Sequence, residues 1–171
     1  MHPSLRALSL AAALAGGLSL GARPAAAATQ IAQVSATVAK PLILTRVQDL
    51  DLGSITLGPG TWSNATVGIS RTGTFSCASA NLICTGATKP AIYNVSGTNN
   101  RIVRIIAPNV TMVNQANPSQ TLTLVTDVAA SVTLTNSGPP GTDFDIGGTI
   151  ALSSSTPSGT YSGTFNVTVD Y

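Results

Sequence analysis

The thirteen residues that close the sequence, 159–171, alternate between apolar and polar side chains. Even positions carry Thr, Ser, Asn or Asp. The odd positions are apolar or aromatic apart from the glycines, namely Gly159, Tyr161, Gly163, Phe165, Val167, Val169 and Tyr171. A period of two places successive side chains on opposite faces of a β-strand. The pattern therefore predicts a half-buried final strand, and the rest of the chain must supply a sheet for it.

Short stretches of the same period recur through residues 40–158, and turn sequences such as Gly58-Pro59-Gly60 and 138–141 separate them. After the first 28 residues, no helical period persists for ten residues. Many short strands with Gly/Pro turns are typical of sandwiches. We therefore expect an all-β fold, an immunoglobulin-like antiparallel β-sandwich over residues 40–171. Both parities of residues 101–107 are apolar in places, so the sequence does not show which of them faces inward. The glycine at 148 indicates a bulge or a close approach.

Residues 1–28 have the composition of a secretory signal peptide. Arg6 precedes an apolar, alanine-rich run over residues 7–22, and Ala26-Ala27-Ala28 offers a small-residue cleavage site. We predict that this segment is removed and that the mature protein is exported through the periplasm to the cell surface or the medium. No later segment is apolar for long enough to predict an integral membrane helix.

The composition argues against catalysis. The only histidine, His2, lies in the predicted leader, and the sequence contains no glutamate. General bases and most metal ligands are therefore missing from the mature chain, and we expect no enzyme activity and no cofactor. The mature chain is also close to electrically neutral, so nucleic acid is not an expected partner. Two aspartate pairs, Asp49 with Asp51 and Asp143 with Asp145, leave calcium binding as an alternative, because carboxylate oxygens are ligands of that ion. The more ordinary interpretation is that they are solvated residues of strands or turns.

Cys77 and Cys84 are the only cysteines. An exported protein meets an oxidising compartment, so we expect them to form a disulfide that staples a hairpin or loop. A loop this short gives a stabilisation of roughly 2–3 kcal/mol in the chain-entropy treatment.

A second alternating segment, residues 29–39, directly follows the predicted cleavage site. Its apolar parity consists of Ala32, Val34, Ala36 and Val38, and Lys40-Pro41 marks its end. Two interpretations remain open at this point. The segment is either the first strand of the chain's own sheet or a donor strand that adds to a neighbouring molecule by β-augmentation.

The end of the chain resembles subunits of bacterial chaperone–usher pili. Those subunits close on an alternating strand with a glycine about twelve residues before a near-terminal tyrosine, as Gly159 stands before Tyr171; there the tyrosine is usually penultimate, whereas here it is last. This resemblance implies a periplasmic chaperone, an outer-membrane usher and related subunits as partners. Residues 42–53, Gly147-Gly148-Thr149 and the closing stretch also resemble the exported domain of unknown function 4402 family, which implies a secreted β-sandwich.

These patterns support two hypotheses about function. The first is a structural subunit of a fimbria- or pilus-like surface fibre, in which residues 29–39 of one copy complete the next copy. The second is a self-complete secreted sandwich that binds a glycan or matrix component on Trp62 or Tyr93. Exposed strand edges are normally blunted by charge or proline, and both end strands carry little of either. We therefore expect assembly.

Overall fold

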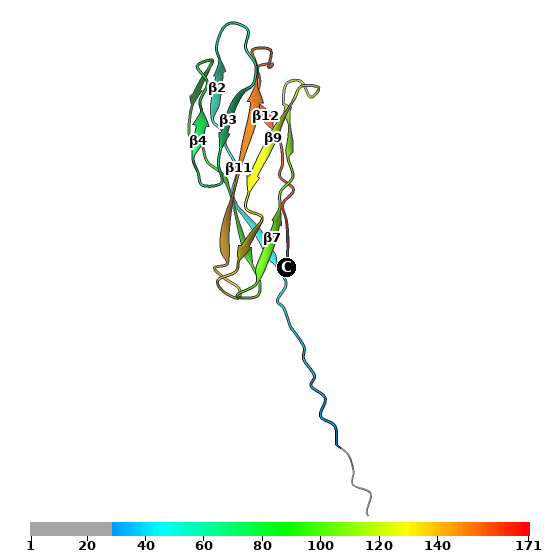
Figure 1. Ribbon diagram of the computed structural model, residues 1–171. Helices are drawn as coiled ribbons and strands as arrows, with labels where there is room; N and C mark the ends of the chain where they lie inside the picture. The colour runs from blue at the N-terminus through cyan, green and yellow to red at the C-terminus, as the bar shows by residue number, and fades with distance from the viewer. Residues whose placement is uncertain (1–28) are drawn as a thin grey trace, which may run out of the picture. The chain divides into compact units, whose positions relative to one another are not determined.

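The computed structural model describes residues 29–171 and contains only β-strands as regular elements in that range (Figure 1). The predicted signal peptide lies outside the described residues. Within them, no helix is long and apolar enough to cross a membrane. The strands are β1 (Ile43–Gln48), β2 (Ser54–Leu57), β3 (Ala65–Ile69), β4 (Phe75–Cys77), β5 (Leu82–Thr85), β6 (Ala91–Ser96), β7 (Ile102–Ile106), β8 (Val110–Asn114), β9 (Thr121–Val128), β10 (Ser131–Thr133), β11 (Thr142–Leu152), β12 (Tyr161–Ser162) and β13 (Thr168–Asp170).

The large sheet is built around β11, its longest strand. The sheet has eight strands in the order β1-β6-β11-β9-β8-β12, and β3 and β4 join it beside β11. One edge of β11 pairs first with β6 and then with β3, while its other edge pairs with β9. Every one of these pairings is antiparallel. The strand β11 therefore joins two halves of the domain.

Two smaller sheets cover the large sheet, one in each half. The three-stranded sheet β10-β7-β13 contributes Val103 and Ile105 to a core with Tyr93, Val95 and Ile146 of the large sheet. The two-stranded sheet β2-β5 contributes Leu82, which packs in a second core with residues of β3, β9 and β11. The expected all-β antiparallel sandwich is confirmed. The parity of β7 is also settled, because Val103 and Ile105 are buried and Ile102, Arg104 and Ile106 are exposed.

Gly147 and Gly148 lie where β11 changes partner from β6 to β3. A β-carbon at residue 148 would lie 2.7 Å from a methyl of Leu124, and one at residue 147 would overlap the backbone of Ile69 and Ser70. Glycine is needed here because neighbouring backbone and core side chains approach closely. The close approach expected at residue 148 is confirmed.

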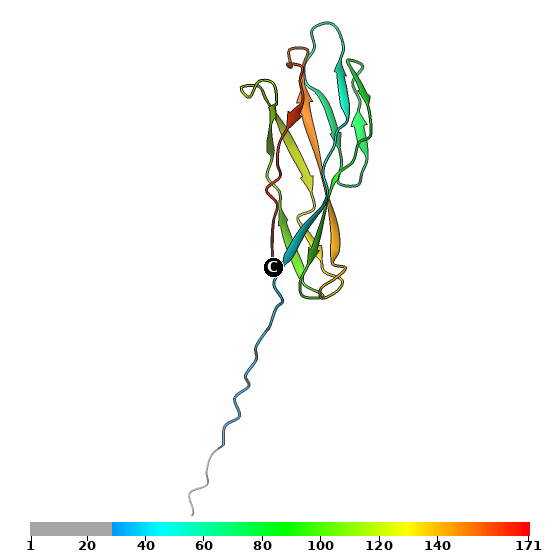
Figure 2. The same cartoon turned by 180° about the vertical axis from the view of Figure 1, so that it is seen from behind.

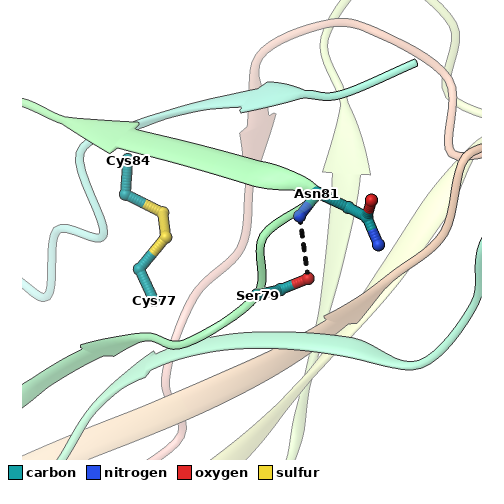
Figure 3. Close-up of a disulfide and its surroundings, with 4 residues drawn as sticks. All are labelled: Cys77, Ser79, Asn81 and Cys84. Atoms are coloured by element: carbon teal, nitrogen blue, oxygen red, sulfur yellow. Dashed lines mark hydrogen bonds between the residues drawn. A yellow bond between two sulfur atoms is a disulfide. The ribbon is translucent and has the colours of Figure 1, made fainter.

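Cys77 and Cys84 form the expected disulfide, with their Cα atoms 6.3 Å apart (Figure 3). The bond does not staple a hairpin, because β4 pairs with β3 in the large sheet and β5 pairs with β2 in a small one. It therefore joins the two layers of the sandwich. Disulfides are typical of proteins in an oxidising, exported environment.

Both ends of the described chain differ from the sequence expectation. Residues 29–39 form no strand in this structure, so the interpretation as a first strand of the chain's own sheet is not what is observed. The predicted continuous strand at the C-terminus is two short strands, β12 and β13, with five unpaired residues between them. The physical reason for both differences is the same: an amphipathic segment becomes a strand only where a sheet edge meets it.

We predict that the variant C77S/C84S loses roughly 2–3 kcal/mol of unfolding free energy, because the crosslink no longer restricts the unfolded chain. Urea denaturation of the mature protein measures this loss. Reducing the unsubstituted protein should reproduce the shift, and reduction should leave the double variant unchanged. Equal stability of the oxidised protein and the double variant would contradict the prediction.

Candidate docking groove

The last eleven residues connect the two layers of the sandwich along one side of the molecule, as Figure 2 shows in red. Tyr161 and Ser162 pair with β8 at an edge of the large sheet. Thr168–Asp170 pair with β7 at an edge of the three-stranded sheet. Residues 163–167 lie between these two ladders and belong to neither. The final segment therefore has a stretch of backbone without a strand partner.

The final segment alternates between its two faces as its sequence predicts. Tyr161, Phe165, Val167 and Val169 are half-buried, and the even positions from 162 to 170 are exposed. Phe165 packs against the cores of both halves. The predicted inward parity is thus present, although none of these inward side chains is fully buried. An apolar row that remains half-covered is unusual for the final strand of a closed sandwich.

A buried asparagine on β8 fixes the start of this segment. Asn114 is only 1 % exposed. Its Nδ2 donates to the Ser158 carbonyl at 3.1 Å and to Gln120 Oε1 at 2.8 Å, and its Oδ1 accepts from the Ala116 N–H at 3.0 Å. Gly159 has a φ of 151°, and a β-carbon there would overlap the Asn114 amide. The glycine therefore allows the chain to pass directly over Asn114.

Gly163 lies on the inward face of the segment, between Tyr161 and Phe165. It is the one position of that face between them, and it has no side chain. A β-carbon built there would lie 2.6 Å from Val110 Cγ1 and 3.0 Å from the Thr111 carbonyl oxygen. Glycine lets the segment approach β8 at this point. Gly163 itself is exposed, and it lines a hollow together with Val110, Met112 and Phe165.

A groove runs between the final segment and the chain from β1 to β2. At one end, a hollow of about 410 Å³ lies between Ile55–Leu57 and residues 156–161. At the other end, a hollow of about 300 Å³ lies between Arg46, Tyr93 and Phe165. Two further hollows lie between them, and adjacent hollows share lining residues, among them Leu50 and Tyr161. The four hollows therefore lie next to one another along the final segment, and we call them together the groove.

The walls of the groove are incompletely covered parts of the core. Leu50, Ile55, Leu57, Met112 and Leu122 contact buried core residues but are themselves only partly buried. Apolar side chains that pack on one side and face an open groove on the other would gain from further coverage, at about 25 cal/mol per Å² of apolar area. The groove thus combines exposed apolar surface with the free backbone of residues 163–167.

Tyr171 links the C-terminus to the start of the sandwich domain. Its hydroxyl donates to the Lys40 carbonyl at 2.7 Å and accepts from the Thr98 N–H at 2.7 Å. The Lys40 N–H donates to Thr98 Oγ1, also at 2.7 Å. The Arg101 guanidinium lies 5.7 Å from the centre of the Tyr171 ring, a distance suited to a cation–π contact. We call this set of contacts the Tyr171 clamp.

The segment 29–39 is solvent-exposed at every residue. Val34 is 94 % exposed and Val38 is 89 % exposed, and Ala32 and Ala36 are exposed with them. Ile31, on the opposite parity, is 95 % exposed. Single exposed apolar residues are ordinary, but a row of them in an uncharged segment is unusual in a free protein.

The aromatic residues considered for a glycan site do not form an exposed platform. Trp62 is half-buried against the core and donates its Nε1–H to the Gly58 carbonyl at 3.2 Å. Tyr93 is buried and stacks on Phe144 with ring centres 5.8 Å apart. Burial raises the pKa of the Tyr93 phenol, although the charge of Arg46 partly opposes that effect.

Three of the four aspartates considered for calcium engage protein partners, and among them Asp143 Oδ1 accepts from Asn94 Nδ2. Asp49 forms an ion pair with Arg46 at 2.9 Å, and Asp51 Oδ1 accepts from the Gly53 N–H at 2.8 Å. On β11, desolvation and the neighbouring charge of Asp143 raise the pKa of the Asp145 carboxyl. Across residues 29–171, no three His, Cys, Asp or Glu residues converge in a metal-binding arrangement.

The sequence did not single out Asn114, Leu50 or Met112 as parts of a site. Asn114 follows a short apolar strand and resembles a turn residue. Leu50 and Met112 read as ordinary inward residues of alternating stretches. No signal in a single sequence distinguishes a core residue that faces a groove from one that is covered.

We predict that Asn114→Ala lowers the unfolding free energy by about 1–3 kcal/mol, because the Ser158 carbonyl and the Ala116 N–H lose a buried partner. It should also loosen the start of the final segment. Thermal or urea unfolding measures the loss, and Thr111→Ala on the exposed face of β8 is the control, expected within about 0.5 kcal/mol of the unsubstituted protein. Equal stability of the two variants would contradict this role for Asn114.

Comparison with known proteins places the chain in a family without assigning an activity. Residues 42–171 match the family model described as domain of unknown function (DUF4402), which covers most of the chain and begins after the exposed segment. No curated protein matches, and no solved structure matches. Of the two resemblances noted from the sequence, the one to this family is therefore confirmed: the chain belongs to the DUF4402 family.

Proposed function

We propose that this protein is a structural subunit of a bacterial surface fibre, in which residues 29–39 of one copy occupy the groove of the next. The observation that carries the proposal is the groove beside residues 163–167, which have no strand partner. The same chain carries an exposed segment of complementary character. A strand added at a free edge gains main-chain hydrogen bonds, and its alternate side chains enter pockets.

The length of the segment suits the groove. Residues 29–39 and 161–171 are each eleven residues long. A strand of that length extends about 36 Å, so the donor could lie beside the whole final segment. Donor and acceptor would then form a continuous ladder that includes the unpaired stretch 163–167.

The chemistry of the segment suits the groove as well. Residues 29–39 carry no charged side chain, so their docking would bury none. Ala32, Val34, Ala36 and Val38 share one face and would point at the apolar walls around Leu50, Met112 and Phe165. Full burial of each exposed valine would contribute about 1.5–3 kcal/mol.

The two ends of the groove set the direction of the donor. Tyr171 and its contact with Lys40 lie beyond the end of the groove at Arg46 and Phe165, whereas residues 156–159 lie at the opposite end, near the top of Figure 1. Residue 39 of the donor stays attached to its own domain and must leave through the end without the clamp. The donor would thus run antiparallel to residues 161–171.

Repetition of this contact generates a fibre. The donor segment and the groove are different surfaces, so the contact is heterologous, and heterologous contacts that do not close into a ring make filaments. Delivery of such subunits requires export, in keeping with the disulfide. A periplasmic chaperone that shields the groove and an outer-membrane usher are part of this proposal.

We predict that Val34→Asp abolishes multimers, because it places a charge in the apolar groove. Ser35→Asp is the matched control. It places the same charge on the opposite, solvent-facing parity and should leave multimers intact. Deletion of residues 29–38 should likewise leave export intact and remove multimers. Unheated gel electrophoresis and size-exclusion chromatography measure these outcomes. Persistent multimers in the deletion variant, or equal effects of the two aspartates, would rule out the mechanism.

We predict further that a Thr37→Cys copy and a Ser162→Cys copy form a disulfide between two molecules, because both residues lie on the outward parity near the open end of an antiparallel ladder. The control pair combines Thr37→Cys with Thr168→Cys and should not crosslink between molecules. Mass spectrometry of crosslinked peptides from a mixture of singly substituted chains reads out each pair. A link through residue 168 in place of residue 162 would show the opposite orientation.

A further inference from the structure

We infer that Tyr171 is a positioning residue that prevents the donor segment from filling the groove of its own molecule. This inference rests on the proposed docking of residues 29–39. A donor tethered to its own groove competes with docking between molecules, because short tethers give effective concentrations of about 1 mM. A subunit that polymerises through this segment therefore needs a feature that disfavours self-insertion.

The Tyr171 clamp lies at the point where such a reversal would occur. To enter its own groove, the segment 29–39 must reverse direction before Ile43, the first residue of β1. The reversal therefore has to involve residues 40–42. In the clamp, the Lys40 carbonyl accepts from the Tyr171 hydroxyl and the Lys40 N–H donates to Thr98 Oγ1. Both backbone groups of Lys40 are thus held in one orientation.

The local sequence makes a tight reversal without the clamp difficult but not forbidden. Two-residue hairpin loops need a positive φ at their first central residue, and Pro41 fixes φ near −65°. A wider loop that also uses residue 39 avoids this restriction and leaves Thr37 outside the loop. Such a loop must release Lys40 from the Tyr171 hydroxyl. The clamp therefore opposes the wider loops that Pro41 still allows.

The residues around the Tyr171 hydroxyl leave room for it and form hydrogen bonds with it. Gly97 is buried, and a β-carbon at that residue would overlap the Tyr171 hydroxyl. The Thr98 N–H donates to the same oxygen. The Arg101 guanidinium lies over the Tyr171 ring. The hydroxyl therefore has both a donor and an acceptor, and only a glycine at residue 97 leaves room for it.

Self-insertion and docking between molecules differ in strand direction. A segment that folds back from Lys40 would run parallel to residues 161–171 and bring Thr37 near Thr168. A donor from another copy would run antiparallel and bring Thr37 near Ser162. The same cysteine pairs therefore distinguish the two states, provided that links within one molecule are separated from links between molecules by mass.

The test is Tyr171→Phe, which keeps the ring and removes the hydroxyl. Loss of two hydrogen bonds at Lys40 and Thr98 should raise the Thr37–Thr168 crosslink within one molecule about tenfold and lower the multimer fraction. Thr126→Val is the matched control. It also removes a hydroxyl that donates to a backbone carbonyl, that of Ala107 at 2.7 Å, but it lies away from the groove and the clamp and should change neither readout.

Thr98→Val provides a second variant in case Tyr171→Phe does not fold, as judged by its thermal unfolding. It removes the acceptor of the Lys40 N–H and should shift both readouts in the same direction. Unchanged multimers and no crosslink within one molecule, in whichever of the two variants is folded, would overturn the inference. Failure of the proposed function is a separate outcome, because the chain with Tyr171 intact would then give no Thr37–Ser162 link between molecules.

Discussion

The structure depends on one stretch of backbone, residues 163–167, that lies between two sheets and pairs with no strand of either. The final segment starts on the large sheet with β12 and ends on the three-stranded sheet with β13, and the backbone between them pairs with neither. Backbone N–H and C=O groups are satisfied by a partner or by water. As long as they face water, the inward side chains beside them stay half-covered, and the groove along Leu50 and Tyr161 stays open.

The long strand β11 explains why the final segment passes both halves of the domain. Because β11 pairs with β6 in one half and with β3 in the other, the two cores are placed end to end, and each receives its own covering sheet. The first and last segments of the sandwich pass both cores on one side. Phe165 contacts both of them. A strand inserted along this side would therefore cover both cores at once. A single docking event would then stabilise both halves of the domain.

The sequence predicted the faces of the strands better than their partners. Alternation identified the buried rows on β3, β6 and β11 and the inward parity of residues 161–169, because side-chain periodicity is a local property. It wrongly predicted a continuous final strand, and it could not show whether residues 29–39 pair within the chain, because pairing depends on which edges the fold presents. The disulfide was anticipated, but its role as a link between layers was not, since Cys77 and Cys84 are close in sequence. The tertiary contacts of Asn114 and Tyr171 have no local signature at all.

Amide hydrogen exchange at residues 163–167 tests the central claim most directly. The chain without residues 29–38 is measured alone and with a synthetic peptide of residues 29–39. If these amides lack a partner until a donor strand pairs with them, they exchange rapidly in the truncated chain and at least about tenfold more slowly once the peptide is bound. Equal, strong protection with and without the peptide would show that the sandwich is already complete and would contradict the account.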